Sequence, residues 1–494
     1  MPPIDVILAG FADAFTLVNL AFVIFGVAIG QLVGAIPGIG PVMAMAIAIP
    51  FTFTLSPLVA ISFLVGINKG GLFGGAIPAV LINTPGTPDA AATATDGFPL
   101  AARGKPRKAT KMALYASVTG DTFSDLVLIA ASAPIAVLAL KLGPVEVCAL
   151  MILAFAVIAG LVGDSLIKGL IAAFLGLLLS TVRLDPERFS PRFDFGYFQL
   201  YDGLNLVAVA VGMLAVAEII RRIAGAGSTP APAAAPQIDT REAKSVSWAE
   251  YWSCRWTMLR GALIGTALGA LPGIGSTAAA YISYASAKRK PGKGEVPFGE
   301  GNLNGIAATE SANSAVMGAN LIPLLGIGIP GSISAALLIS AFVIHGIQPG
   351  PLLFRTQAEL IYGLFGAMLM ANLCNLLVGH VSLRAWTFAV KAPASLIFPG
   401  AMIFCIAGVY LSSGGLFGVV IMLLSAALSL VLTSAGIPVV VLLIAFFLGR
   451  RFETTLSQSL TILNGDPLLL ADHPIALVLL LLSAALAVWM AWRR

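Results

Sequence analysis

The sequence predicts an all-α polytopic membrane protein, and three observations support this class. The 494 residues are 58% hydrophobic and only 10% charged, whereas soluble proteins carry about 25% charged residues. Apolar runs of 18 residues or more recur along the chain, and each is long enough to cross a hydrocarbon core of about 30 Å as a helix. Lys and Arg cluster between these runs, as they do in the cytoplasmic loops of membrane proteins.

We expect about 10–14 transmembrane helices, because several apolar runs are long enough for two spans or for a re-entrant pair. In chain order the apolar runs are residues 14–36, 41–66, 112–140, 146–163, 166–182, 204–220, 258–287, 312–344, 358–380, 395–411, 415–448 and 474–492. The first run is not expected to be a cleaved signal peptide, because residues 1–13 have no basic region and contain Asp5 and Asp13.

The basic clusters predict which loops face the cytoplasm. Residues 103–111 carry five cations and no acid, and further clusters lie at 221–222 and 288–293. The positive-inside rule assigns all three to the cytoplasmic side. Four apolar runs separate Lys111 from Arg221, and an even number of crossings returns the chain to the same side, so the two criteria agree.

A hydrophilic linker at residues 224–256 divides the chain into two membrane halves, 1–223 and 257–494. Its first part is rich in Ala and Pro and has no core-forming pattern. Its second part, "SWAEYWSCRW", brings four aromatic side chains close together. Because aromatic rings favour the headgroup region, we expect an interfacial amphipathic helix at this point, and a cytosolic loop is the alternative.

The two halves contain related sequences. Residues 26–40, "GVAIGQLVGAIPGIG", match residues 261–275, "GALIGTALGALPGIG", at nine of fifteen positions. A second match, at an offset of 245, pairs 77–87 with 322–332 and Asn68 with Asn313. Two matches in the same order indicate a duplicated unit.

The charges around these matches predict that the two units face opposite ways. The first "PGIG" is followed by neutral residues and the second by "KRK", whereas the first "TPGT" precedes a basic loop and the second break, "IPGS", a charge-poor loop. Basic and neutral flanks are thus exchanged between the copies, as inverted repeats of secondary transporters require.

Both copies contain helix-breaking residues inside apolar sequence. The breakers are Pro37, Gly38, Gly40, Pro272, Gly273 and Gly275 in the "PGIG" motifs, and Pro85, Gly86, Pro330 and Gly331 in the second elements. Such breaks survive in a membrane where protein buries them or a polar cavity hydrates them. Helix N-termini at a break suit a carboxylate, and freed carbonyls suit a small cation. The alternative is that they are packing kinks, where glycine lets helices approach closely.

About fourteen apolar residues lie on each side of the second "PGIG", which is too short for a comfortable span. Positive charges at Arg260 and Lys288 bracket this segment. We therefore predict that it enters the membrane and returns, with "PGIG" at its tip.

Polar residues gather near the breaks, and we predict that they form a substrate or ion site. The predicted site residues are Asn68, Lys69, Asn83, Thr84, Pro85, Gly86, Thr87, Asn313, Pro330, Gly331 and Ser332. Lys69 needs a partner inside the membrane, and the two readings are an ion pair with Asp89, Asp96 or Glu310, or a contact with a substrate anion. Asp121 and Asp125 share one helical face, and we expect them near the membrane interface rather than at the site of a coupled cation.

The motifs are similar to those of the large transmembrane subunit of the tripartite tricarboxylate transporters, the TctA family. The similarity is carried by "GAIPGIGP", "NKGGLFGGAIPAVLINTPGTPDAAATATDGFPLAARGK", "RFDFGYFQLYDGLNLVAVAVGMLAVAE", "GALPGIGSTAAAYISYASAKR", "FGEGNLNGIAATESANSAVMGANLIPLLGIGIPGSISAALLI" and "HGIQPGPLLF". It covers nearly the whole chain, and its motif positions include Asn83, Thr84, Pro85, Gly86, Asn313, Pro330, Gly331 and Ser332.

The resemblance implies a multi-pass permease of the bacterial cytoplasmic (inner) membrane that imports a carboxylate such as citrate. It implies two partners, a small four-helix membrane subunit and a periplasmic substrate-binding protein, and symport driven by Na⁺ or H⁺. We expect no cofactor beyond that coupling ion, no metal beyond Na⁺ and no nucleic-acid partner.

Two other classes of function remain open: a channel and a membrane-embedded enzyme. Against an enzyme, His345, His380 and His473 are scattered, and the sequence has no HExxH or paired-carboxylate motif. Against a channel, paired helix breaks suit alternating access better than one continuous pore.

Overall fold

The computed structural model describes residues 3–36, 40–162, 165–185, 189–225, 245–271, 273, 275–289, 295–389, 394–413 and 415–492. Helices make up most of this part of the chain. In it, strands β1 (Arg183–Leu184) and β2 (Pro191–Arg192) form one short antiparallel pair. The predicted all-α class is confirmed.

Helices follow one another along both halves of the chain. The first half contains α1 (Ile4–Ala14), α2 (Leu17–Gly34), α3 (Pro41–Thr52), α4 (Pro57–Ile82), α5 (Ala90–Ala102), α6 (Pro106–Ala139), α7 (Pro144–Val162), α8 (Leu166–Ser180), η1 (Phe198–Leu200), α9 (Leu206–Ala210), η2 (Val211–Val216) and α10 (Ala217–Gly225). The second half begins with α11 (Trp248–Ser253), α12 (Arg255–Gly269), α13 (Gly275–Lys288), α14 (Leu303–Ala319), α15 (Leu321–Ile327), α16 (Ile333–Ile344), α17 (Leu353–Thr356) and α18 (Ala358–Ala389). It ends with α19 (Ala394–Ser412), α20 (Leu416–Ser434), α21 (Val439–Ile462), η3 (Pro467–Asp472) and α22 (Pro474–Trp492).

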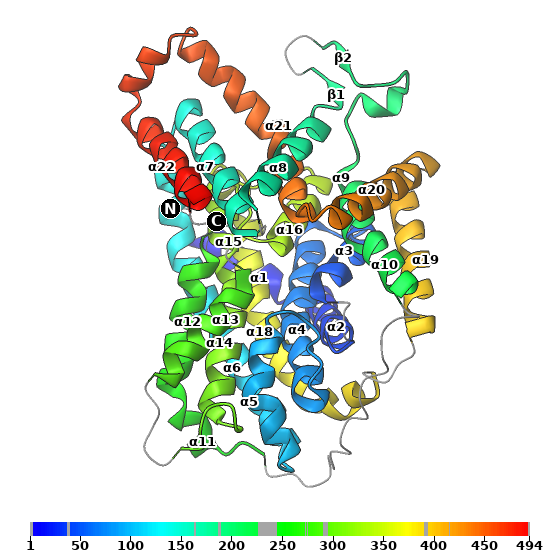
Figure 1. Ribbon diagram of the computed structural model, residues 1–494, viewed down its shortest axis with the longest axis vertical. Coiled ribbons are helices and arrows are strands. Elements are labelled where there is room, and N and C mark those ends of the chain that lie inside the picture. The colour runs from blue at the N-terminus through cyan, green and yellow to red at the C-terminus, as the bar shows by residue number, and fades with distance from the viewer. Residues whose placement is uncertain are drawn as a thin grey trace.

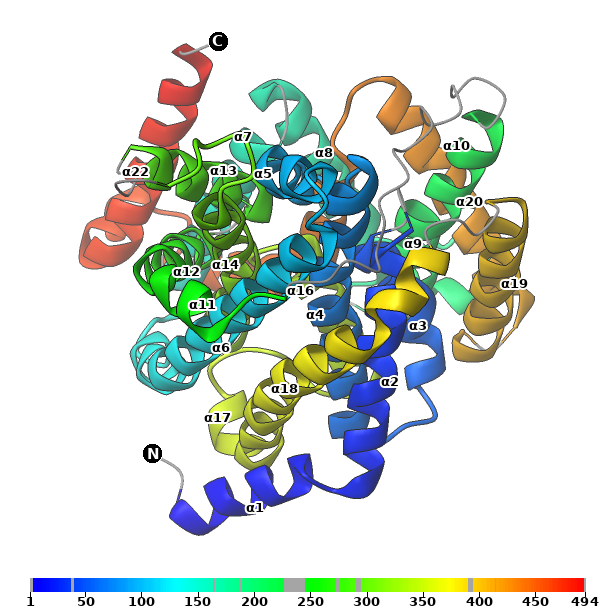
Figure 2. The same cartoon turned by 90° about the horizontal axis from the view of Figure 1, so that it is seen from below.

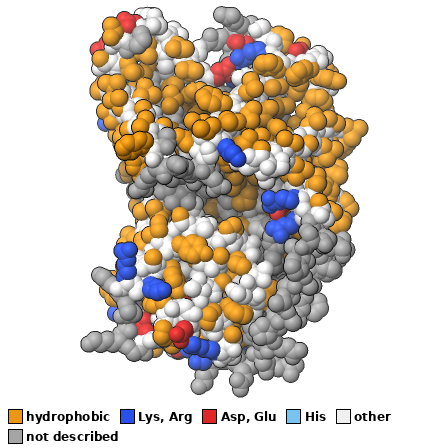
Figure 3. All heavy atoms as spheres, in the orientation of Figure 1, with side chains coloured by type: hydrophobic (Ala, Val, Ile, Leu, Met, Phe, Trp, Pro, Cys, Tyr) orange, Lys and Arg blue, Asp and Glu red, His pale blue; other side chains and the backbone are white. Residues whose placement is uncertain are grey.

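Among the described residues, five helices are long and apolar enough to cross a membrane: α2, α4, α6, α18 and α20. Shorter apolar helices include α3, α7, α8 and α16. Hydrophobic side chains cover much of the face in Figure 3, and Lys and Arg appear there in small separate groups. The chain is therefore a multi-pass membrane protein, while the total of 10–14 crossings stays a prediction.

The duplicated unit is visible in how two helix pairs pack. In the first half, glycines 26, 30 and 34 of α2 lie against the backbone carbonyls of residues 63, 67 and 71 of α4. In the second half, glycines 261, 265 and 269 of α12 lie in the same way against residues 308, 312 and 316 of α14. Equivalent glycines of the two units are 235 positions apart in the sequence, and the residues that they contact are 245 positions apart. The two sequence matches thus correspond to the same packing motif.

The segment after each break packs on the long helix of the other unit. After the first break, α5 and α6 pack against α14; after the second, α16 and α18 pack against α4. The helix that precedes each glycine-rich helix also packs on the other unit. Helix α1, which precedes α2, packs on α18, and Tyr251 of α11, which precedes α12, contacts Tyr115 of α6. Figure 2 shows α18 beside α2 and α11 beside α6. The two units therefore exchange equivalent elements.

The long helices α4 and α14 run in opposite directions. Along α6 and α14 the contacts advance together, from Gly120 beside Ser311 to Asp125 beside Gly318. Along α6 and α4 the contacts advance in opposite directions. Lys69 of α4 contacts Asp125 of α6. Phe73, further along α4, and Leu114, earlier in α6, both lie beside Gly379. This arrangement supports two oppositely oriented units, whose orientation in a membrane stays a prediction.

The second "PGIG" joins two antiparallel helices. Arg260, near the start of α12, donates a hydrogen bond of 3.3 Å to the carbonyl of Ser286, near the end of α13. The two helices have 15 and 14 residues, about 22 Å each at 1.5 Å per residue. The predicted hairpin is confirmed, and its entry into a bilayer stays a prediction.

Helices α7, α8, α21 and α22 pack together at the top of Figure 1, away from α5 and α11 at the bottom. Their interior includes Phe155, Ile158, Leu442 and Phe446. This group also packs against the second unit, because Arg451 of α21 donates a hydrogen bond of 3.0 Å to the carbonyl of Ile327 at the end of α15.

Most of the predicted linker, residues 226–244, lies outside the described residues. Its end is the short helix α11, which begins with a capping box formed by Ser247 and Glu250. Trp248, Trp252 and Trp256 are all exposed. An exposed row of indole rings suits the membrane interface, so the interfacial helix remains our prediction for this segment.

Candidate binding site

The first break is held in place by close backbone contacts. Helix α4 ends at Asn83, which adopts a left-handed conformation with φ 53°. Gly86 then donates a backbone hydrogen bond of 3.1 Å to the carbonyl of Gly75. A methyl group on Gly86 would overlap the carbonyl of Gly34, so glycine is required where the break crosses the end of α2.

The second break has the same place in its unit. Helix α15 ends at Gly328, which has φ 74°, and Ser332 caps the next helix by accepting a hydrogen bond of 3.2 Å from the amide of Ala335. Gly273, in the "PGIG" of the same unit, donates its amide to the carbonyl of Gly331 at 3.2 Å. The tip of the hairpin and the second break are therefore in direct contact.

The "PGIG" motifs are described at three of their glycines. Gly40, Gly273 and Gly275 have φ of 47°, 88° and 76°, values that glycine adopts without strain. Each motif separates two helices. Pro37, Gly38 and Pro272 lie outside the described residues.

Asn68, in the middle of α4, contacts the other unit. Its amide oxygen accepts a hydrogen bond of 3.3 Å from the hydroxyl of Ser334, which lies just after the second break. Its amide nitrogen lies 2.7 Å from the sulfur of Met317 in α14. One predicted site residue thus joins the second break to the middle of the first unit.

Asn313 makes the equivalent approach from the other direction. Its side chain, together with the hydroxyls of Thr87 and Ser276, faces the carboxylate of Asp89, just after the first break. The offset of 245 that relates Asn68 to Asn313 also relates Asp89 to Ser334. Each mid-helix asparagine therefore meets the residue two positions past the other unit's break.

The cluster around Asn313 has unsatisfied polar atoms. Thr93 donates a hydrogen bond of 2.5 Å to one carboxylate oxygen of Glu310, in α14. Within the described part of the chain, the buried atoms without a hydrogen-bond partner include Thr87 Oγ1, Asp89 Oδ2, Glu310 Oε2, Asn313 Oδ1 and Asn313 Nδ2. Asn313 and Thr87 thus face Asp89 without completing a direct hydrogen bond. Each such group costs about 1–3 kcal/mol if it stays unpaired, so this cluster is suited to a ligand.

The predicted partners of Lys69 are wrong. Its ammonium lies 3.1 Å from Asp121 Oδ1 and 2.8 Å from Asp125 Oδ2, and it donates to Asn372 Oδ1 at 2.8 Å. Asp121 and Asp125 are buried inside the protein, with 0% and 1% exposed, while their depth in the membrane stays a prediction. A buried ammonium needs compensating charge, and α6 supplies it with two carboxylates one helical turn apart. Lys69 is thus directed at α6 and α18 instead of at the breaks.

Asp96 and Glu310 therefore do not pair with Lys69. Asp96 accepts hydrogen bonds from the hydroxyl of Tyr284 at 2.9 Å and from three backbone amides, those of residues 299, 301 and 302, at 2.8–2.9 Å. It fastens the middle of α5 to the loop before α14.

Not every predicted residue joins the cluster. Thr84 donates its hydroxyl to the carbonyl of Ile82, and Asn83 is exposed. Pro85 is half-buried, and Pro330 and Gly331 are buried at the second break. The motif residues 83–85 therefore shape the break, while Thr87 and Asp89, further on, supply the inward-facing groups. Asp89 and Ser334 were detectable in the sequence, because the offset of 245 already pairs them.

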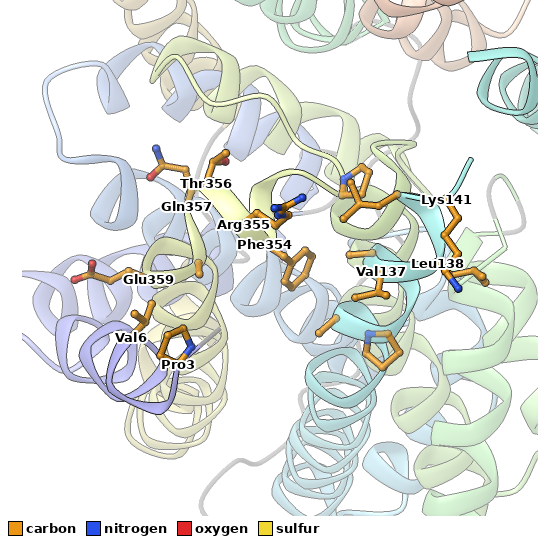
Figure 4. Close-up of a pocket in the computed structure, with 16 residues that line it drawn as sticks. Pro3, Val6, Val137, Leu138, Lys141, Phe354, Arg355, Thr356, Gln357 and Glu359 are labelled. Carbon is orange, nitrogen blue, oxygen red and sulfur yellow. The ribbon is translucent and has the colours of Figure 1, made fainter. Parts of the chain in front are cut away.

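A cavity of about 1030 Å³ lies elsewhere, between α1, the end of α6 and α17–α18. Figure 4 shows Lys141 and Arg355 around it, on different segments. Its lining includes none of the predicted site residues, so the candidate site is the cluster at the breaks.

The fold and the site define a multi-pass helical membrane protein with two related units. The helix break of each unit lies beside the central asparagine of the other unit. Residues 20–444 match the model of the tripartite tricarboxylate transporter TctA family. The chain belongs to this family, which confirms the family predicted from its motifs. It is therefore a tricarboxylate transporter subunit.

Two curated relatives come from Agrobacterium vitis. An uncharacterized 52.8 kDa protein in the TAR-I ttuC' 3' region is 34% identical over 481 residues, which is 97% of this chain and 94% of the relative. An uncharacterized protein in the TAR-II ttuC' 3' region is 34% identical over 216 residues, covering 44% of this chain and 89% of the relative. No solved structure gives a significant match.

Proposed function

We propose that this chain forms the membrane pathway through which a tripartite system imports a carboxylate across the bacterial inner membrane. Its partners in this proposal are a small four-helix membrane subunit and a periplasmic binding protein that delivers the substrate. The substrate class is a citrate-like tricarboxylate or a related organic acid. The family membership supports the transporter class, and the direction of transport, the partners and the substrate class belong to the proposal.

One observation carries the proposal. The hydrogen bond between Ser334 and Asn68 and the approach of Asn313 to Asp89 join the two units at the first and the second break. Discontinuous helices that meet between two repeats are the usual place for substrate and ion sites in secondary transporters. A small relative movement of the units would open or close this region, as alternating access requires.

The chemistry near the second break suits an organic anion. Ser332 and Ser334 lie at the start of α16, where backbone amides and the positive end of the helix dipole favour a carboxylate. The amide of Asn68 adds a donor without adding a charge. Neutral donors bind an anion strongly enough to select it and weakly enough to release it.

We further propose that transport is symport with Na⁺ or H⁺. Inward movement of an anion against the membrane potential needs an energy source, and a coupled cation supplies it. The substrate itself is best identified by ligand screening of the binding protein encoded beside this gene.

Counterflow in proteoliposomes tests the proposal. Vesicles containing this chain and the small membrane subunit are loaded with unlabelled carboxylate and given the labelled compound, with the binding protein, outside. A carrier accumulates label transiently against its gradient. Simple equilibration of label would indicate a channel, and chemical conversion of the substrate would indicate an enzyme; either result would overturn the proposal.

Uptake should also depend on the binding protein and on an ion gradient. Robust uptake by this chain alone would contradict the tripartite assignment while leaving a transport function in place.

A further inference from the structure

The two equivalent contacts differ in charge. Where the first unit has Asn68 facing Ser334, the second has Asn313 facing the carboxylate of Asp89. Glu310 adds a second carboxylate one helical turn before Asn313, whereas the residue at the offset of 245 in the first unit is Val65. The acids are thus confined to one of two related places.

Asp89 and Glu310 lack a basic partner among the described residues. Both are buried, with exposed fractions of 5% and 0%, and they are close enough to interact electrostatically. Lys69 is committed to Asp121 and Asp125. Two carboxylates taken out of water without a cation cost far more than any hydrogen bond at this place returns.

Neutral polar side chains lie beside the same carboxylate. Asn313 and Thr87 are buried, with 1% and 5% exposed, and both face Asp89. The amide oxygen of Asn313 and the hydroxyl of Thr87 have no hydrogen-bond partner in the described part of the chain. A shared proton would satisfy one of these acceptors, whereas a hard cation can take several oxygen ligands at once.

We propose that Asp89, Glu310, Asn313 and Thr87 bind the Na⁺ that drives transport. The inference rests on the proposed symport and names its ion and its site. Asp89 belongs to the segment after the first break, and Glu310 and Asn313 belong to the other unit. Na⁺ therefore holds the first break against the second unit and leaves the acid-free place, at Asn68 and Ser334, to the organic anion.

This division explains why only one copy is acidic. A substrate carboxylate placed beside Asp89 and Glu310 would be repelled by them, and Na⁺ placed beside Ser334 would meet no opposite charge. Bound Na⁺ also neutralises part of the acid pair, so the anion is more readily accepted after the cation. Ion and substrate are thereby coupled through the contact between the units.

Direct binding of ²²Na⁺ to the purified full-length chain in detergent micelles tests the proposal at constant ionic strength, with choline as the replacing cation. Wild-type protein should bind Na⁺ saturably, and Asp89→Asn and Glu310→Gln should weaken binding at least tenfold. Glu146→Gln, which replaces a carboxylate that contacts His473 in another part of the fold, should bind as the wild type does. Thr87→Val, which keeps the shape of the side chain, should also weaken binding and covers the case in which an acid variant does not fold.

Wild-type affinity in Asp89→Asn, Glu310→Gln and Thr87→Val, or the absence of saturable Na⁺ binding by the wild type, would overturn this site. Carboxylate counterflow, measured separately, distinguishes the two proposals. Net uptake of carboxylate that is driven by a proton gradient without Na⁺ overturns the Na⁺ site and leaves the import function. Saturable Na⁺ binding lost in the variants, without any counterflow, supports the site and counts against carboxylate import.

Discussion

The hydroxyl of Ser334 donates a hydrogen bond of 3.3 Å to the amide oxygen of Asn68, although 266 positions separate them in sequence. Ser334 lies two residues past the second break, and Asn68 lies in the middle of the other unit's long helix. Its counterpart, Asp89 with Asn313, repeats the relationship with the units exchanged. The break in each unit is therefore positioned by the other unit, which gives a duplicated sequence one shared centre.

The glycine rows that define each unit should tolerate no side chain. Gly30→Ala places a methyl group on the carbonyl oxygen of Ile67, and Gly265→Ala places one on that of Ala312. Because the neighbours are backbone atoms that cannot rotate away, each substitution should destabilise the protein by about 1–3 kcal/mol or more. Thermal unfolding in detergent measures the effect.

Gly400→Ala is the matched control, since no atom lies within 4 Å of the added methyl group. This substitution should leave the melting temperature unchanged or raise it slightly, because alanine favours the helix. Equal melting temperatures for all three variants would show that the helices do not pack at the glycines.

The buried ion pair should be structural. Lys69→Met leaves Asp121 and Asp125 without their cation, and removing one partner of a buried pair typically costs about 3–5 kcal/mol. We expect a large loss of folded protein, measured by size-exclusion chromatography and thermal unfolding.

Combining Lys69→Met with Asp121→Asn and Asp125→Asn should recover most of this stability, because no charge is then left unpaired. Failure of the triple variant to recover, despite intact membrane insertion, would mean that Lys69 stabilises the fold in another way.

Ser332 and Thr87 should affect transport more than stability. Ser332→Ala removes the cap of α16, at a cost of about 1 kcal/mol, and Thr87→Ala removes an inward-facing hydroxyl. Both should lower the affinity for substrate or Na⁺ while insertion stays normal. Unchanged uptake kinetics in both variants would assign these residues to packing alone.

Helix α11 should lie at the headgroup level of the membrane. Trp248 and Trp252 are exposed, and their rings stack with a centroid distance of 5.9 Å. In variants that keep one of these two tryptophans as the sole tryptophan, fluorescence should be quenched by lipids labelled near the headgroup and little by lipids labelled deep in the chain. Equal insensitivity to both labels would place the helix in water.

The sequence predicted the architecture better than the contacts of individual side chains. Repeated "PGIG" motifs and exchanged charges carried the information about duplication, because backbone breaks and loop charges are local features. The partners of Lys69 were missed for the opposite reason. Asp121 and Asp125 lie on a helix more than fifty residues away, and no periodicity within α4 or α6 says which faces meet.

The acid cluster was only partly predictable. Asn313 and Thr87 were expected at the site, and the offset of 245 relates Asp89 to Ser334. The approach of Asp89 to Asn313, however, depends on α5 crossing to the second unit. That exchange depends on how the long helices pack in three dimensions, and a local sequence pattern does not indicate it.

The central claim is that the two units share one transport site, and the most direct measurement is counterflow by Asn68→Ala and Asn313→Ala. Both variants are reconstituted with the small membrane subunit and assayed with the labelled carboxylate identified by screening the binding protein. We predict that each raises the half-saturation concentration for substrate or Na⁺ at least tenfold, with melting temperatures close to that of the wild type. Wild-type counterflow kinetics in both variants would contradict the shared site.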